Sequence, residues 1–255
     1  METKFENIKI TKKHLLDSNI YTKNIITIDG CIFASGTLKY LTKELKNNQN
    51  ISILEIINCT IKPLNMYTIT KMLKVNTGLD KLVMNDCNIT DDSLEILVMG
   101  LKKNNTLQHL ELSDNLFPIS LNFANIIKYN AGLKTIIATG LDEEIACNNN
   151  FIPLYNALIK NKTLQYLNLS NCYLRDDDNI IFNALSRNYN LEKLNITDNY
   201  VDYKMLANNL INNHTLKKLI IDSPRDESEF FFETIFMNNT IQNLKIRNSI
   251  NIGFK

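Results

Sequence analysis

The sequence contains no tryptophan and only four prolines and seven glycines among its 255 residues. It also has no glycine-rich phosphate loop, no G-x-S-x-G nucleophile motif and no H-E-x-x-H zinc motif, so the usual signatures of three large enzyme classes are missing. No apolar run approaches the roughly 18 residues of a membrane span, and the first residues lack the apolar core of a signal peptide. We therefore expect a cytoplasmic, intracellular protein that does not contact a membrane.

An excess of charge of either sign is missing too, because 28 basic residues balance 27 acidic ones. Such a chain has no global field to hold nucleic acid, and any charged partner has to be met locally. We expect a protein partner, with nucleic acid present only as part of a nucleoprotein assembly. The sequons within the repeats described next agree with an intracellular location, because a glycan there would obstruct packing.

A repeated pattern is the main feature that is present. In KKNNTLQHLELSDNLF, residues 102–117, apolar residues and one Asn follow the first leucine at offsets 3, 5, 8 and 10. The pattern L-x-x-L-x-L-x-x-N/C-x-L recurs with successive steps of 28, 28, 28, 26, 31, 27, 25 and 25 residues. The repeats start at Lys23, Ile51, Leu79, Leu107, Leu133, Leu164, Leu191, Leu216 and Ile241. A period near 28 is typical of leucine-rich repeats.

The pattern has a physical interpretation. Offsets 3 and 5 lie on the inner side of a short strand, and the Asn or Cys at offset 8 turns inward to serve backbone groups left unpaired at the bend. An Asn also stands three residues before each start from the second repeat on; these are Asn48, Asn76, Asn104, Asn130, Asn161, Asn188, Asn213 and Asn238. We expect each of them to end a helix with a left-handed backbone, which Asn accepts readily.

The segments between the strands are expected to be helical. Residues 37–48, 91–104 and 176–188 place apolar residues three and four apart, and Pro63, Pro118 and Pro153 stand where a first helical turn tolerates proline. The acidic pairs Asp91-Asp92 and Glu143-Glu144 and the triplet at 176–178 fall at helix starts, where the helix dipole favours negative charge, so capping explains them better than cation binding.

Because strands stack about 4.8 Å apart and helices about 10 Å apart, the array must bend with the sheet inside. With its period, its strand core and its N-x-x-L turn, the chain resembles the ribonuclease-inhibitor-like class of leucine-rich repeats over residues 23–252. That class is similar to the repeat domains of Ran GTPase-activating proteins, tropomodulins and nucleotide-binding immune receptors. The resemblance implies an α/β solenoid, a horseshoe with a parallel concave sheet and convex helices in about nine repeats, and a binding function.

The ends of the solenoid need cover. Residues 1–22, with Phe5, Ile8, Ile10, Leu15, Leu16 and Ile20, are predicted to form an N-terminal cap, and residues 23–255 one continuous leucine-rich-repeat domain with a truncated last repeat. At the other end, either Ile250, Ile252 and Phe254 fold back as a small lid or a partner covers the edge.

Candidate chemistry is sparse. Cys31, Cys59, Cys87 and Cys172 all occupy offset 8, so a buried ladder explains their spacing, whereas Cys147 lies off register and is the candidate exposed thiol. His109 and Glu111 face the same side of one strand, where a base and an acid could meet, but no nucleophile accompanies them. We predict no catalytic residue, no metal site and no cofactor.

Offsets 2, 4 and 6 of each strand point away from the core and form the predicted concave face. An aliphatic group among charges suits a protein interface, although strand propensity or cover by the N-terminal segment also explains it. The late basic cluster could meet an acidic segment or a phosphate backbone, and Tyr166 is the expected anchor. The predicted partner-binding residues are Ile53, Ile57, Val83, His109, Glu111, Ile137, Tyr166, Lys193, Lys218, Lys245 and Arg247.

The main hypothesis is a non-enzymatic, protein-binding adaptor or regulator that uses its concave face and C-terminal end. One alternative is a stably bound subunit or inhibitor of a large assembly, for example a ribonucleoprotein. Another is a GTPase-activating scaffold, although no catalytic motif of that group is present. The irregular segments 140–152 and 222–230 are secondary binding candidates because irregular units form loops at the surface.

Overall fold

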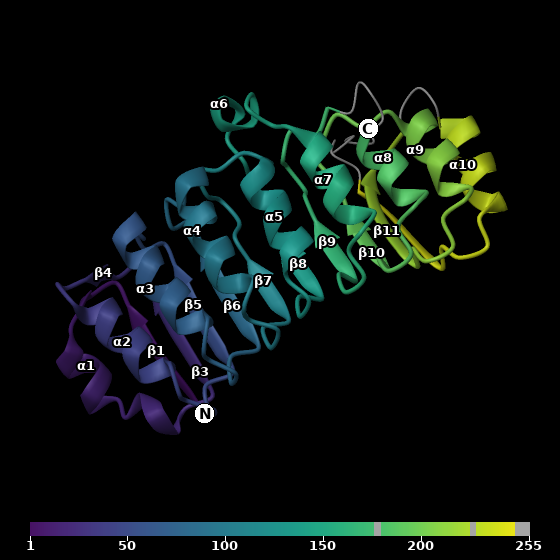
Figure 1. Cartoon of the computed structure of the whole chain (residues 1–255). Coiled ribbons are helices and arrows are strands. Elements are labelled where there is room, and N and C mark those ends of the chain that lie inside the picture. Colours follow the sequence, from purple (N-terminus) through teal and green to yellow (C-terminus); the bar gives the residue numbers. More distant parts are fainter. Residues whose placement is uncertain (176–179, 225–227, 248–255) are drawn as a thin grey trace, which may run out of the picture.

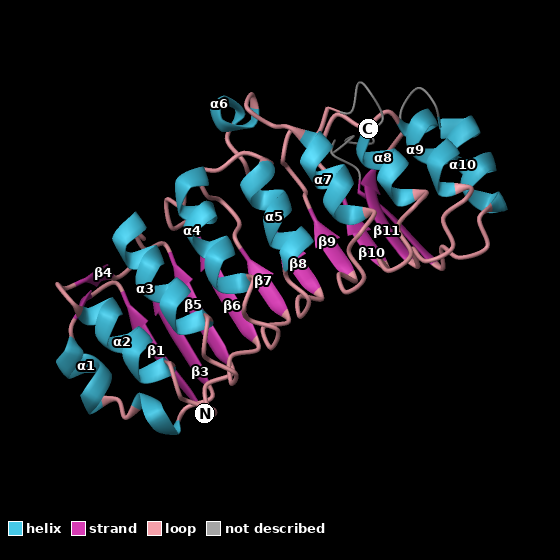
Figure 2. Cartoon of the chain, in the orientation of Figure 1, coloured by secondary structure: helices cyan, strands magenta, loops and turns pink. Residues whose placement is uncertain are grey.

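The computed structural model describes residues 1–175, 180–224 and 228–247. In this part of the chain the fold is α/β: strands and helices alternate, and the strands form an open, parallel, ten-stranded sheet (Figure 1). Helices lie along one face of that sheet (Figure 2). None of the described helices is both long enough and apolar enough to cross a membrane.

The order of strands in the sheet follows the order in the chain. The strands are β1 (Glu2–Glu6), β3 (Ile25–Asp29), β5 (Ile53–Ile57), β6 (Lys81–Asn85), β7 (His109–Glu111), β8 (Thr135–Ile137), β9 (Tyr166–Asn168), β10 (Lys193–Asn195), β11 (Lys218–Asp222) and β12 (Asn243–Arg247). The short strands β2 (Lys9–Ile10) and β4 (Ile32–Phe33) pair separately.

The helices connect consecutive strands. They are α1 (Lys12–Asp17), α2 (Thr37–Leu45), α3 (Pro63–Leu73), α4 (Asp91–Leu101), α5 (Leu121–Tyr129), α6 (Glu143–Ala146), α7 (Phe151–Leu158), α8 (Ile180–Leu185), α9 (Tyr203–Leu210) and α10 (Ser228–Met237), with a 3-10 turn at Ile20–Thr22. Neighbouring parallel strands cannot be joined by a tight turn. The chain therefore has to cross back between them, and here it does so through a helix.

The N-terminal segment contributes a strand of its own. β1 pairs with β3 in parallel, with Glu2 opposite Ile25 and Phe5 opposite Ile28. Phe5 and Leu15 of this segment are buried in the core. Residues 1–22 therefore extend the sheet by one strand as well as covering the edge of β3.

The core runs along the inner side of the strands. As predicted, the residues at offsets 3 and 5, such as Leu110 of β7 and Leu112 directly after it, are fully buried. The last described strand differs, because Ile246 of β12 is 37% exposed and the side chains of Phe236 and Met237 in α10 are 83% and 73% exposed. Ile250, Ile252 and Phe254, the predicted lid, lie outside the described residues.

Most of the helix starts predicted from acidic residues and prolines agree with the structure. Asp91 and Asp92 occupy the first turn of α4, and Pro63 is the first residue of α3. The expectation for Pro118 was wrong, because α5 begins three residues later, at Leu121. There the Ser120 hydroxyl accepts hydrogen bonds from the backbone N–H groups of the first turn and so fixes the start of the helix.

The eight asparagines that stand three residues before the repeat starts, which we call the asparagine ladder, stabilise the fold in another way than predicted. Its members do not have left-handed backbones; Asn130, for example, has a φ of −95°. Instead, the side chain of Asn104 accepts hydrogen bonds from the N–H of Leu107 at 2.8 Å and of Thr106 at 3.1 Å. Its amide group donates to the carbonyl oxygens of Leu73 at 2.8 Å and Asn76 at 3.0 Å in the preceding repeat. Each buried Asn thus joins two repeats.

The left-handed backbone occurs instead one to three residues after the strands, at offset 7. Seven repeats have a Gly, Asn or Asp there with positive φ: Gly30, Asn58, Asp86, Asp114, Gly140, Asn171 and Asp198. These residue types adopt that conformation at the lowest cost. At offset 8, Asn115 accepts hydrogen bonds from the N–H groups of Cys87 and Ile89, both at 3.0 Å, which confirms the predicted role of that position.

Candidate functional site

The sheet face opposite the helices carries rows of cross-strand neighbours, which we call the open face. Its first row runs in register over nine strands: Ile25, Ile53, Lys81, His109, Thr135, Tyr166, Lys193, Lys218 and Asn243. These side chains are half-buried, except for the exposed Asn243. The repeat alignment therefore places these predicted side chains in one row.

A charge network occupies the first half of the open face. The Lys81 ammonium lies 3.0 Å from one carboxylate oxygen of Glu111 and 3.8 Å from Glu55. Glu55 also accepts a hydrogen bond from the hydroxyl of Thr27 at 3.0 Å. The ammonium of Lys81 thus balances carboxylates from the strands on both sides.

His109 and Glu111 do meet, as their spacing suggested. The Nε2 atom of His109 is 2.6 Å from Oε1 of Glu111. The hydrogen bond with His109 and the ammonium of Lys81 lower the pKa of Glu111 to about 2, against the opposing effect of burial. A carboxylate with so low a pKa is a poor proton acceptor near neutral pH, so the geometry favours an electrostatic role over acid–base chemistry.

The aliphatic residues are less accessible than expected. Ile53, Ile57 and Ile137 are half-buried, and Val83 is only 2% exposed, so the expectation that Val83 lies on an exposed surface was wrong. Val83 is in register with Glu55 on one side and Glu111 on the other. Val83 thus lies between the two carboxylates that the ammonium of Lys81, from the same strand, approaches.

Tyr166 stands at the middle of the open face. The ammonium of Lys193, its neighbour in register on β10, lies 3.6 Å from the centre of the Tyr166 ring. Burial and the negative charge of Glu111 raise the pKa of the Tyr166 hydroxyl. The hydroxyl therefore stays protonated and can donate a hydrogen bond.

The second half of the open face is basic. Lys193 and Lys218 are opposite each other on β10 and β11, and Lys245 lies on β12 opposite Ile220. Arg247 also comes from β12, but its guanidinium is 2.5 Å from a carboxylate oxygen of Asp198. An ion pair therefore neutralises the charge of Arg247. The sequence pattern placed Arg247 in the basic cluster with the lysines, and it did not predict this contact.

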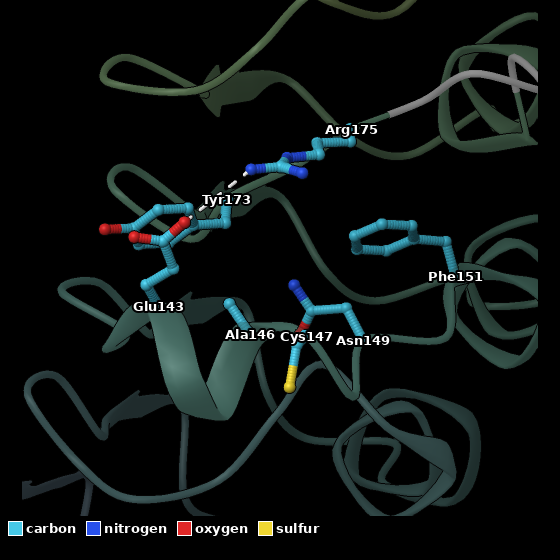
Figure 3. A pocket seen from close by; sticks show the side chains of 7 residues that line it. All are labelled: Glu143, Ala146, Cys147, Asn149, Phe151, Tyr173 and Arg175. Atoms are coloured by element: carbon cyan, nitrogen blue, oxygen red, sulfur yellow. Dashed lines mark ion pairs between the residues drawn. The ribbon is translucent and has the colours of Figure 1, made fainter.

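A separate hollow lies at the rim, near the irregular fifth repeat. Its volume is about 400 Å³, and it is lined by Glu143, Ala146, Cys147, Asn149, Phe151, Tyr173 and Arg175 (Figure 3). Arg175 is 3.9 Å from Glu143, whereas the thiol of Cys147 donates a hydrogen bond to the Glu144 carbonyl oxygen at 2.8 Å. The predicted loop 140–152 contains helix α6, and Cys147 is exposed.

The other cysteines belong to the core. Cys31, Cys59, Cys87 and Cys172 are buried at offset 8, as predicted. Burial raises the pKa of Cys59 to about 11 and of Cys87 to about 12. Thiols held protonated in this way are poor nucleophiles and poor metal ligands. Among the described residues, no three of His, Cys, Asp and Glu gather as a metal-binding group.

Of two contacts on the open face, one could have been predicted from the sequence. Tyr166 and Lys193 share offset 2 in consecutive repeats, so strand pairing alone brings them together. The Arg247–Asp198 pair was harder to predict, because it connects β12 with the turn three residues after β10, across the intervening strand β11.

Comparisons with known proteins do not assign this chain to a family. No protein-family model matches the chain, and no curated protein matches it. Among 94 matching chains of solved structures is one described as leiomodin-1 actin-binding site 2, with 21% sequence identity and a TM-score of 0.39. The match covers 42% of this chain and 64% of that one, less than two thirds of its length. We draw no conclusion about function from it.

Proposed function

We propose that this chain is a leucine-rich-repeat solenoid of the ribonuclease-inhibitor-like class. We further propose that it acts in the cell as a non-enzymatic adaptor or regulator by binding another protein. The 28-residue period, the parallel sheet and the Asn ladder support the first part. The second part rests on one observation, the in-register open face with its half-exposed side chains.

The composition of the open face suits a protein partner. Aliphatic Ile53 and Ile137, aromatic Tyr166 and the charged rows lie within one surface. Protein interfaces combine an apolar and aromatic centre with a polar rim in this way. The bond between Lys81 and Glu111 keeps the charged part organised before any partner arrives, which lowers the entropy lost on binding.

The C-terminal end offers a second contact region. Phe236 and Met237 of α10 and Ile246 of β12 expose large apolar side chains at the last described unit. Exposed apolar groups that lie together often mark interaction sites. In our proposal this end extends the interface beyond the sheet face.

Site-specific photo-crosslinking tests the proposal. A benzophenone amino acid would replace Ile137 on the open face in one variant and Leu121, an exposed residue of α5 on the helix side, in the other. Irradiation in source-cell lysate should yield a discrete crosslinked protein from position 137 and little from position 121. Crosslinking from position 121 alone would place the interface on the helices and contradict the proposal.

The basic half of the open face favours a second candidate, a subunit of a larger assembly such as a ribonucleoprotein. Lys193, Lys218 and Lys245 would then contact phosphate groups. Phosphate contacts weaken steeply with salt because bound counterions are released, whereas an apolar protein interface changes little. Retention of the partner at high salt therefore separates the two candidates.

A further inference from the structure

Three lysines on the open face lack counter-charges. Within residues 1–175, 180–224 and 228–247, no carboxylate lies within 4.0 Å of the ammonium of Lys193, Lys218 or Lys245. Lys193 and Lys218 are adjacent in register, and Lys245 lies one strand further and two residues along. Strand spacing and rise separate their Cα atoms by roughly 5 Å and 8 Å.

The arrangement is electrostatically unfavourable as it stands. Burial, followed by the positive charges of Lys218 and Lys245, lowers the pKa of Lys193. The two nearby aspartates make other contacts: Asp198 bonds to Arg247, and Asp222, the last residue of β11, accepts the backbone N–H of Asp198. In the first half of the face, by contrast, Lys81 balances Glu55 and Glu111.

Tyr166 completes the cluster. Its ring lies under the ammonium of Lys193 and holds that group in place, while its hydroxyl remains a neutral donor. A hydrogen-bond donor next to Lys193, at one end of a row of cations, is a suitable environment for carboxylate oxygens.

We propose that the cluster of Tyr166, Lys193, Lys218 and Lys245 receives an acidic segment of a protein partner, with carboxylates bound between the lysines. This inference rests on the proposed function and specifies the partner's chemistry. In an extended segment, side chains on the same side recur about every 6.7 Å, which is comparable to the spacing of these lysines.

Charge on the rest of the face favours an acidic peptide over nucleic acid. The cluster covers only the last part of the sheet, and Glu111 lies two strands from Tyr166. A longer phosphate backbone that continued along the face would meet the carboxylates of Glu111 and Glu55, whereas a short segment fits within the basic half. The net charge of +1 gives no wider field for nucleic acid.

Fluorescence anisotropy with the full chain tests the inference. The probes are a labelled peptide with Glu at every second position, the same peptide with Gln, and a single-stranded oligouridine of the same length. The test variant is the triple change Lys193→Gln, Lys218→Gln, Lys245→Gln. The matched control removes the same charge from the helix side at exposed positions, by Lys39→Gln, Lys43→Gln and Lys46→Gln.

We expect the Glu peptide to bind at low salt and to lose roughly tenfold or more in affinity in the triple variant, given a few-fold per exposed charge pair. The control should bind like the wild type, and the Gln peptide should not bind. Circular dichroism verifies folding, and the single Lys218→Gln and Lys245→Gln changes provide milder variants if the triple variant unfolds.

The inference is overturned if the Glu peptide fails to bind, if the triple variant binds it undiminished, or if oligouridine binds more tightly. Crosslinking from position 137 distinguishes this failure from failure of the proposed function. A crosslink that persists in the triple variant would leave the open face as the interface and remove only the acidic segment.

Discussion

The ammonium of Lys193 lies 3.6 Å from the ring centre of Tyr166 on the neighbouring strand. Because the ring face is electron-rich, this contact partly compensates Lys193 for the positive charges of Lys218 and Lys245. The contact also fixes the position of the aromatic ring at the boundary between the balanced and the basic halves of the open face. Tyr166 thus links the stability of the face to its recognition properties.

This contact predicts that two substitutions of Tyr166 differ in their effect on the free energy of unfolding. Tyr166→Phe keeps the ring and should leave the free energy of unfolding within about 0.5 kcal/mol of the wild type, because the Tyr166 hydroxyl makes no hydrogen bond to another described residue. Tyr166→Leu should lose about 0.5–1 kcal/mol more, the usual size of an exposed cation–π contact. Urea denaturation measures both; equal stability of the two variants would show that the ring does not stabilise Lys193.

The Glu111 network predicts a pH effect. The pKa of Glu111 is about 2 in the folded chain, below its ordinary value of 4.5, so its contribution to stability is present above pH 4.5 and is lost as the pH falls towards 2. The difference in unfolding free energy between wild type and Glu111→Gln should shrink by about 1–3 kcal/mol over that range. A difference that stays constant between pH 5 and pH 2.5 would contradict the network.

The asparagine ladder predicts that replacing a ladder asparagine destabilises the protein far more than replacing the asparagine next to it. Asn104→Ala removes five hydrogen bonds and leaves the carbonyl oxygens of Leu73 and Asn76 without this donor, so we expect a loss of about 2–4 kcal/mol. The adjacent Asn105 is exposed, and Asn105→Ala should change stability by less than about 0.5 kcal/mol. Denaturant midpoints for the two variants provide the comparison, and similar losses would refute the assignment of the ladder to Asn104.

The hydrogen bonds of Asn115 predict how strongly different substitutions at this position lower the stability of the protein. Asn115→Ala would leave the N–H groups of Cys87 and Ile89 without their acceptor, at a cost of about 2–3 kcal/mol. Asn115→Cys should cost less, because Cys59 at the same offset accepts the N–H of Cys31 at 3.2 Å. Thermal unfolding of both variants tests this order, and greater damage from cysteine would contradict it.

Much of the architecture follows from the repeat in the sequence. The strand core and the cross-strand rows of the open face could be predicted because the apolar spacing fixes which side chains point inward. The left-handed positions were misplaced because Asn has two uses, and the sequence does not separate a backbone turn from a buried side-chain bridge. The Gly, Asn and Asp residues at offset 7, such as Gly140 and Asp198, were a signal for the turn.

The details of the candidate site were harder to predict. Periodicity places Val83 on the open face, but it does not show that Val83 is buried between the carboxylates of Glu55 and Glu111, which Lys81 connects. Likewise, Arg247 looked like a member of the basic cluster until its contact with Asp198 was known. Long side chains reach across strands, so their partners depend on three-dimensional distances.

The most direct test of the account is a quantitative capture experiment from source-cell lysate at low and high salt. Three immobilised chains would be compared: wild type, Tyr166→Ala, and the helix-side control with Lys39→Gln, Lys43→Gln and Lys46→Gln. The account predicts that one protein is retained by the wild type and the control at both salt concentrations and is strongly reduced with Tyr166→Ala. Equal retention by Tyr166→Ala, or loss in the helix-side control, would contradict binding through the open face.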